Sequence, residues 1–118
     1  MGTFSVSIEI SSSAAGRFVK ADALVDTGAT HTLLPRDLLE DLGVSSIDRV
    51  PFQLADDRTV EYEVGEARLR LDGRERTTLV VFGPAGTMPL LGATTLELFN
   101  LAVDPVRQKL MPVPGLMK

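Results

Sequence analysis

The sequence contains no cysteine and no tryptophan, and it has a single histidine, His31. Without cysteine there can be no disulfide framework and no thiolate metal site, so the fold must rest on packing. Long apolar runs are also absent, since no stretch approaches the ~18 residues that span a bilayer. Residues 1–5 lack a basic segment followed by an apolar one. We therefore expect a soluble, cytoplasmic protein with no membrane partner.

Charge is not concentrated in any one part of the chain. There are 12 basic and 16 acidic residues, a net charge of −4, and the basic residues are spread along the sequence. This distribution argues against nucleic acid as a partner. With 118 residues and 44% hydrophobic composition, the chain can bury one compact core. We predict a single domain over residues 1–118.

Short strands separated by turn signals are predicted along most of the chain. Apolar and polar residues alternate over residues 4–10, and residues 17–25 are predicted to return as a second strand. Glycine tolerates the positive φ of tight hairpin turns, so Asp72-Gly73 is a strong hairpin signal. The remaining strands are predicted at residues 32–34, 50–54, 59–64, 68–71, 77–82, 101–103 and 109–111.

Two short helices are predicted between these strands. Pro35 and Gly43 bracket residues 36–42, with proline at the start and glycine at the end of the helix. Thr94 followed by Glu97 forms a capping-box pattern, which predicts a helix from about residue 95 to residue 100. Seven or eight strands with two brief helices indicate an all-β, barrel-like domain.

One acidic residue lies in a tight turn that directly follows an apolar strand. Residues 23–25 are all apolar and do not alternate, which predicts that both faces of the strand are covered there. We therefore expect the following loop to lie inside the molecule. Its sequence is Asp26-Thr27-Gly28-Ala29.

This loop and a distant apolar segment resemble the retropepsin-like (clan AA) aspartic proteases, of the bacterial or cellular single-domain type. The segment is Pro89-Leu90-Leu91-Gly92, some sixty residues after the loop. The order of elements along the chain also resembles this family. The resemblance implies a retropepsin-like closed barrel with two short helices.

The resemblance implies a catalytic role for Asp26 in an aspartic endopeptidase. Peptide hydrolysis by carboxylates needs two of them, one as base and one as acid. Asp22 cannot be the second, because four residues of strand separate the two backbones by ~13 Å. The sequence has the motif once, so the active form is expected to be a homodimer with one Asp26 from each subunit.

The resemblance assigns supporting roles to the residues around Asp26. Thr27 would hydrogen-bond to the neighbouring subunit's loop, Gly28 would allow close approach of backbone and substrate, and Ala29 would leave room for the peptide. A second group would pack behind the loop and do no chemistry: Leu90, Leu91 and Gly92.

A charged turn is the candidate for the flap that covers the substrate in this family. It comprises Ala55, Asp56, Asp57 and Arg58. The substrate would be a peptide or protein lying extended as an added strand, and neither a metal nor another cofactor is implied.

The chain departs from the viral pattern in three places. The candidate flap tip has charge and no glycine, Thr30-His31 stands where an acidic residue often follows the motif, and residues 36–42 form a helix in place of a plainer strand. Residues 4–10 and 110–113 are candidates for the dimer interface.

Other interpretations of these residues stay open. Asp26 could be a turn aspartate bonded to its own backbone, and the protein could be a non-catalytic module of the same fold that dimerises or binds peptides. It could also be an enzyme that is monomeric when isolated. His31 without spaced partner ligands is interpreted as an ordinary polar residue, Asp56-Asp57 as a solvated turn and not a metal site, and Thr30 and Thr32 as structural.

Overall fold

The structure, a computed structural model, describes residues 4–115. Within this range the chain forms nine strands and two helices. In chain order they are β1 (Phe4–Ser11), β2 (Val19–Val25), β3 (Thr32–Pro35), α1 (Arg36–Leu42), β4 (Ser46–Gln53), β5 (Thr59–Leu71), β6 (Arg74–Gly83), β7 (Leu90–Leu91), α2 (Ala93–Leu98), β8 (Leu101–Asp104) and β9 (Lys109–Pro112).

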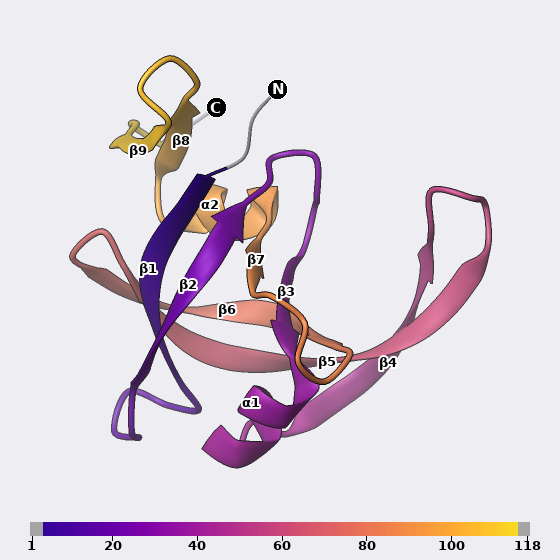
Figure 1. The fold of residues 1–118 in the computed structure, drawn as a ribbon. Coiled ribbons are helices and arrows are strands. Elements are labelled where there is room, and N and C mark those ends of the chain that lie inside the picture. Colours follow the sequence, from indigo (N-terminus) through magenta and orange to yellow (C-terminus); the bar gives the residue numbers. More distant parts are fainter. Residues whose placement is uncertain (1–3, 116–118) are drawn as a thin grey trace.

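Six strands close into a barrel. Their order is β1-β2-β7-β3-β6-β5, and β5 pairs again with β1 to complete the ring. Strand β4 pairs with β5 outside the ring, and Figure 1 shows these two strands leaving the barrel together as a ribbon. The predicted all-β, retropepsin-like closed barrel with two short helices is confirmed.

The core lies inside this ring because one face of each strand is apolar. In β1 the side chains of Ile8 and Ile10 are buried, and in β2 those of Ala23 and Val25 are buried. Alternate residues of a strand point to opposite faces, so the polar residues in the first halves of these strands, such as Ser7 and Asp22, are exposed. Phe99, just after α2, is fully buried and covers one end of the barrel core.

Helix α1 forms as the sequence predicts. Its apolar residue Leu39 is fully buried, and Gly43 adopts a left-handed conformation with φ of 83° directly after the last turn. The N–H of Gly43 donates to Glu40 O, and the N–H of Val44 donates to Leu39 O. These bonds satisfy carbonyls that a helix end otherwise leaves without partners.

Helix α2 begins two residues earlier than the capping-box pattern predicts. It spans Ala93–Leu98 with Gly92 in the N-cap position, and no side chain caps it. The predicted start was wrong because the first amides of this helix bond to backbone carbonyls of another segment. The N–H groups of Ala93 and Thr94 donate to Ala29 O and Thr30 O, at 2.8 and 3.0 Å.

Two strands extend further than predicted. Strand β5 runs unbroken from Thr59 to Leu71 where two separate strands were expected, and β4 begins at Ser46. Gly65 lies in the middle of β5 and is buried, with Ser45 and Phe82 packed against the side where a Cβ would point. The described chain still has nine strands, because β7 (Leu90–Leu91) forms where no strand was expected, and the predicted total of seven or eight was too low.

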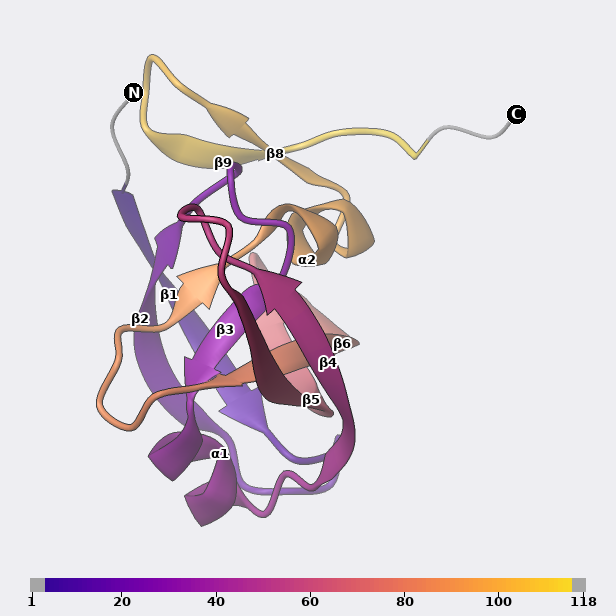
Figure 2. The same cartoon turned by 90° about the vertical axis from the view of Figure 1, so that its right-hand side faces the viewer.

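Two further hairpins, β5–β6 and β8–β9, join strands that the sequence predicts. In the β5–β6 turn, Asp72 and Gly73 both have positive φ, 54° and 74°. Strands β8 and β9 pair only with each other within residues 4–115, as a separate two-stranded sheet. Figures 1 and 2 show this sheet at the same end of the molecule as the loop between β2 and β3.

The helices of the described chain are short. Helix α1 has 7 residues and α2 has 6. A bilayer-spanning helix needs about 20 residues, so no helix within residues 4–115 is long and apolar enough to cross a membrane. The cytoplasmic location stays a prediction.

Candidate active site

Asp26 is the first residue after β2, at the point where this strand pairs with β7. The two strands run parallel, with Leu24 opposite Leu90 and Val25 opposite Leu91. The N–H of Asp26 donates to Leu91 O at 3.1 Å. Residues 26–31, here called the Asp26 loop, therefore begin at a position fixed by backbone bonds to β7.

The turn holds the carboxylate of Asp26 by a backbone amide. The N–H of Gly28 donates to Asp26 Oδ1 at 2.9 Å, and the N–H of Ala29 donates to Asp26 O at 3.2 Å. Gly28 does not need positive φ; instead, an added Cβ would lie only 3.2 Å from Asp26 Oδ1. A purely structural aspartate turn would make the same bond, so this bond alone does not distinguish the two interpretations of Asp26.

The Asp26 loop lies at the surface, so the expectation that it is inside the molecule was wrong. Asp26 and Ala29 are half-buried, and Thr27 and Gly28 are exposed. Burial ends at Val25 because the chain leaves the sheet there and turns at the end of the barrel. Within residues 4–115 the Thr27 hydroxyl makes no hydrogen bond, so it is free to bind a group from another chain.

Strand β7 and the glycine that follows it brace the loop from behind. Leu91 and Gly92 are buried, and Leu90 is half-buried. A Cβ on Gly92 would lie 2.5 Å from both the carbonyl carbon and the oxygen of His31. Only glycine therefore allows the two backbones to pass at this distance, and α2 can then receive its bonds from the loop carbonyls.

Three buried threonine hydroxyls extend this brace into the barrel. Thr32 Oγ1 accepts the N–H of Gly92 at 3.1 Å and lies 2.5 Å from Thr95 Oγ1, which lies 3.0 Å from Thr78 Oγ1. Thr32, Thr95 and Thr78 come from β3, α2 and β6. These hydrogen bonds give each of the three buried hydroxyls a partner, and no buried side-chain N or O atom in the described residues lacks one. Sequence patterns gave no signal for it.

The charged turn predicted as a flap tip joins β4 to β5. The N–H of Leu54 donates to Arg58 O at 2.7 Å, and the N–H of Asp57 donates to Leu54 O at 3.0 Å. Asp56 accepts the backbone N–H of Arg58 at 3.2 Å and its Nε–H at 2.6 Å. Asp57 adopts positive φ of 68°, a conformation that aspartate tolerates better than most residues. Ala55 is exposed, as are the three charged residues.

An aromatic cluster connects this ribbon with the Asp26 loop. The ring centroids of His31 and Phe52 lie 5.1 Å apart in an edge-to-face arrangement, and those of Phe52 and Tyr62 lie 5.9 Å apart. Such pairs favour this geometry because the ring edge is positive and the face negative. His31, set aside in the sequence interpretation, therefore links the loop to residues 46–63, here called the β4–β5 ribbon.

Comparison with known protein families gives one match. The profile of a family described as aspartyl protease matches residues 8–95, a span that includes the Asp26 loop, the β4–β5 ribbon and Gly92. The chain belongs to the aspartyl protease family. No curated protein matches its sequence.

Solved structures of retropepsin-like proteins share the fold of this chain. The protease of simian foamy virus (mac) is 22% identical with a TM-score of 0.61, and the match covers 81% of this chain and 94% of that one. A retropepsin-like aspartic protease from Rickettsia conorii is 21% identical with a TM-score of 0.52, covering 88% and 89%. The retroviral protease-like domain of Ddi1 from Leishmania major is 16% identical with a TM-score of 0.56, covering 92% and 87%.

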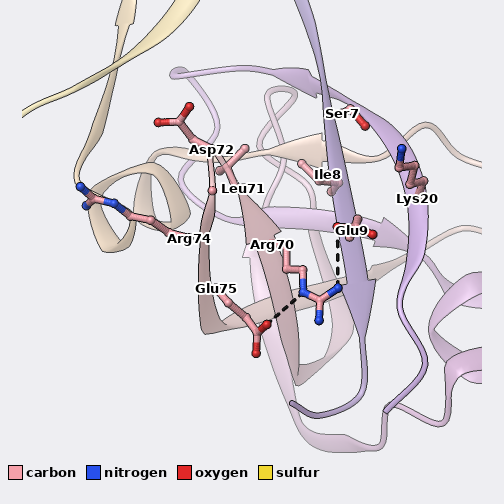
Figure 3. Close-up of a pocket in the computed structure, with 10 residues that line it drawn as sticks. Ser7, Ile8, Glu9, Lys20, Arg70, Leu71, Asp72, Arg74 and Glu75 are labelled. Carbon is pink, nitrogen blue, oxygen red and sulfur yellow. Dashed lines mark hydrogen bonds and ion pairs between the residues drawn. The ribbon is translucent and has the colours of Figure 1, made fainter. Parts of the chain in front are cut away.

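A separate cavity of about 360 Å³ lies on the barrel wall. Its lining comes from β1, β2 and the β5–β6 hairpin, and so from other segments than the Asp26 loop. Figure 3 shows Arg70 between Glu9 and Glu75, and the N–O distances are 3.8 and 3.0 Å. Because these carboxylates balance the guanidinium, the cavity does not present a concentrated charge to a ligand.

Proposed function

We propose that the protein is an aspartic endopeptidase that acts as a homodimer, with Asp26 of each subunit as the acid-base pair. One observation carries the proposal: the aspartyl protease loop occurs once, is braced from behind and has its carboxylate at the surface. A second copy, with its own Asp26, can approach this open side.

Water bound between the two carboxylates would be the nucleophile. The ionised carboxylate takes a proton from this water while the water oxygen attacks the peptide carbonyl carbon, and the protonated carboxyl gives its proton to the carbonyl oxygen. The tetrahedral intermediate then breaks its C–N bond: the carboxyl that took the water proton gives it to the amine nitrogen, and the other carboxylate takes a proton from a hydroxyl of the intermediate. This step releases two peptides and restores one shared proton to the pair. The Gly28 amide keeps one carboxylate oxygen in a fixed orientation throughout.

The end of the barrel that bears the Asp26 loop would face the partner subunit. The exposed Thr27 hydroxyl would bond to the opposite loop. Apolar side chains at the same end support this contact: Val106 in the β8–β9 turn is 90% exposed and Met111 in β9 is 39% exposed. Covering them removes apolar surface from water.

The substrate would be an extended peptide lying between the Asp26 loop and the β4–β5 ribbon, which would act as the flap. Phe52 and Tyr62 are half-buried on one face of this ribbon, where Phe52 meets His31. Main-chain hydrogen bonds would hold the peptide as an added strand.

The Asp26→Asn variant tests the proposal. Its rate of cleavage of a mixed peptide library, followed by mass spectrometry of new termini, should fall by about 10³-fold or more, because the acid-base pair is lost. The matched control is Asp22→Asn, which changes an exposed aspartate of β2 and should leave cleavage unchanged. Equal cleavage by the wild type and Asp26→Asn would exclude the mechanism.

The dimer makes a separate prediction. Specific activity should rise with protein concentration over the range in which sedimentation shows a monomer–dimer equilibrium, since each site needs two chains. Activity should also be highest on the acidic side of neutrality, where a shared proton persists between the carboxylates. Full activity at concentrations where only monomer sediments would contradict the shared site.

A second candidate function is a non-catalytic module of the same fold. The ribbon tip favours it, because Asp56, Asp57 and Arg58 are charged and include no glycine, and an ion pair joins Arg58 to Asp56. This candidate predicts that the protein binds peptides, or a statine-type inhibitor, without producing new termini. Binding with no cleavage by wild-type dimer would favour it over the endopeptidase.

A further inference from the structure

The β4–β5 ribbon leaves the barrel at one well-defined residue. From Val64 onward β5 pairs with β6 in the barrel, but residues 59–63 pair only with β4 among the described strands. Figure 1 shows the ribbon extending away from the barrel beyond this point. A two-stranded ribbon is marginally stable by itself. Contacts near its base must therefore set its angle.

An ion pair occupies the base of the ribbon. Glu63, the last residue before β5 joins the barrel, accepts a hydrogen bond from Arg36 Nη2 at 2.5 Å. The side chains of Arg36 and Glu63 are 37% and 23% exposed. Arg36 is the first residue of α1, and its guanidinium also lies 5.2 Å from the ring centroid of Phe82 in β6. The pair therefore joins the ribbon to both α1 and the barrel.

The charges of this pair reinforce each other. The hydrogen bond from Arg36, with a smaller contribution from Ser46, lowers the pKa of Glu63 below its ordinary value. The bond to Glu63 in turn raises the pKa of Arg36. Both groups are therefore charged at neutral pH, and a charge-assisted bond between them is stronger than a neutral one.

The backbone next to the pair has the features of a pivot. The pairing of β4 with β5 shifts register between Ser46 and Asp48, and such bulges bend a strand. A Cβ on Gly65 would lie 2.6 Å from Ser45 O and 3.0 Å from the Phe82 ring. Strand β5 thus passes Ser45, just before β4, so closely that only a glycine fits at residue 65. A small rotation of the ribbon at this point would displace its far end by a larger distance.

The ribbon's angle determines whether its aromatic face reaches the Asp26 loop. Phe52 lies along β4 beyond the base and contacts His31. We propose that Arg36 and Glu63 are positioning residues that set the angle of the β4–β5 ribbon over the Asp26 loop and thereby strengthen peptide binding. This inference rests on the proposed endopeptidase function, but its structural part does not depend on catalysis.

The Glu63→Gln variant tests the inference in a peptide cleavage assay. Its KM should rise about two- to fivefold while kcat stays nearly constant, the scale expected for a part-exposed ion pair that acts on binding. Glu40→Gln is the matched control: Glu40 is the other partner of Arg36, at 3.3 Å, but it is an exposed residue of α1 and not part of the ribbon. Its KM should not change.

Exchanging the two charges distinguishes a positioning role of the ion pair from a general loss of stability caused by the substitutions. Arg36→Glu alone places a carboxylate beside Glu63 and should raise KM further. The double variant with Arg36→Glu and Glu63→Arg restores an opposite pair and should recover most of the wild-type KM. A double variant no better than Arg36→Glu would contradict the positioning role.

Amide hydrogen exchange provides the readout that does not need activity. In Glu63→Gln, residues 50–62 should exchange several-fold faster than in the wild type, whereas residues 67–71 in the barrel should be unchanged. If no peptide is cleaved, the proposed function fails but this measurement still decides the inference. Unchanged exchange of the ribbon in Glu63→Gln, or an equal change in Glu40→Gln, would overturn it.

Discussion

The Asp26 loop and the β4–β5 ribbon, which face each other, are held by different kinds of contact. The loop is fixed by backbone bonds from residues 26, 93 and 94 and by three buried threonine hydroxyls. The β4–β5 ribbon is held to the rest of the molecule by an ion pair and an aromatic contact, both of them partly exposed. Buried bonds are costly to break, whereas part-exposed pairs contribute little each.

This difference suits the proposed endopeptidase, which needs one fixed element and one adjustable element. A carboxylate that takes part in proton transfer must be held to within a fraction of an ångström. A covering ribbon must instead move to admit and release a peptide, so its local stability belongs at the low end of the molecule's range. The contacts in the two regions match these two requirements.

The largest expected effect comes from disturbing the brace behind the loop. Gly92→Ala places a methyl group 2.5 Å from the carbonyl carbon and oxygen of His31. These are backbone atoms, so they cannot move aside as a flexible side chain could. We expect unfolding free energy to fall by about 3 kcal/mol, measured by urea denaturation, because the packed chains cannot separate without breaking α2 from the loop.

A glycine in a loop provides the control for Gly92→Ala. Gly86 has φ of 76° and no atom within 4 Å of an added Cβ. Gly86→Ala should cost only about 1 kcal/mol, the left-handed backbone strain alone. If both variants lose the same stability, the brace is no tighter than an ordinary turn and the comparison of the two regions fails.

Removing one of the buried threonine hydroxyls should lower the unfolding free energy by less than Gly92→Ala does. Thr95→Val keeps the shape of the side chain but leaves Thr32 and Thr78 without their shared partner. Because these groups are buried, we expect a loss of about 2 kcal/mol in unfolding free energy. Amides 93 and 94, observed by NMR, should exchange faster as their bonds to the loop weaken.

The neighbouring Thr94→Val serves as the control, since Thr94 is exposed on the same helix. It should change stability by less than about 0.5 kcal/mol. A stable Thr95→Val variant with protected amides would show that the backbone bonds hold the Asp26 loop without the hydroxyl chain.

Features that depend on neighbouring residues were predictable from the sequence. Asp72-Gly73 forms the expected hairpin because positive φ at both positions is a local requirement. Helix α1 spans the expected residues because Pro35 and Gly43 act within one turn of its ends. The family pattern likewise depends on short motifs, so the barrel could be predicted from them.

Features that depend on distant partners were not predictable. Helix α2 starts early because its amides bond to loop carbonyls more than sixty residues away, and a local capping pattern contains no information about them. Gly65 looks like a strand break until Ser45 and Phe82 are seen to cover it. The contacts of His31 with Phe52 and of Arg36 with Glu63 join residues brought together only by the closed sheet.

The smallest effect concerns acid stability at the ribbon base. Because Arg36 lowers the pKa of Glu63, the pair stabilises the folded state above the ordinary glutamate value of 4.5. This stabilisation is lost as pH falls through the lowered pKa. Glu63→Gln removes it at every pH, so the difference in urea midpoint between pH 6 and pH 3 should be smaller than in the wild type.

A second glutamate tests whether the Arg36–Glu63 ion pair acts on the β4–β5 ribbon in particular or on the whole barrel. Glu75 on the barrel wall also has a lowered pKa, caused first by Arg68 and then by Arg70. Glu75→Gln should therefore flatten the acid limb as Glu63→Gln does, but only Glu63→Gln should also speed amide exchange in residues 50–62. If Glu75→Gln loosens the ribbon equally, the ion pairs act on the whole barrel and the ribbon has no separate control.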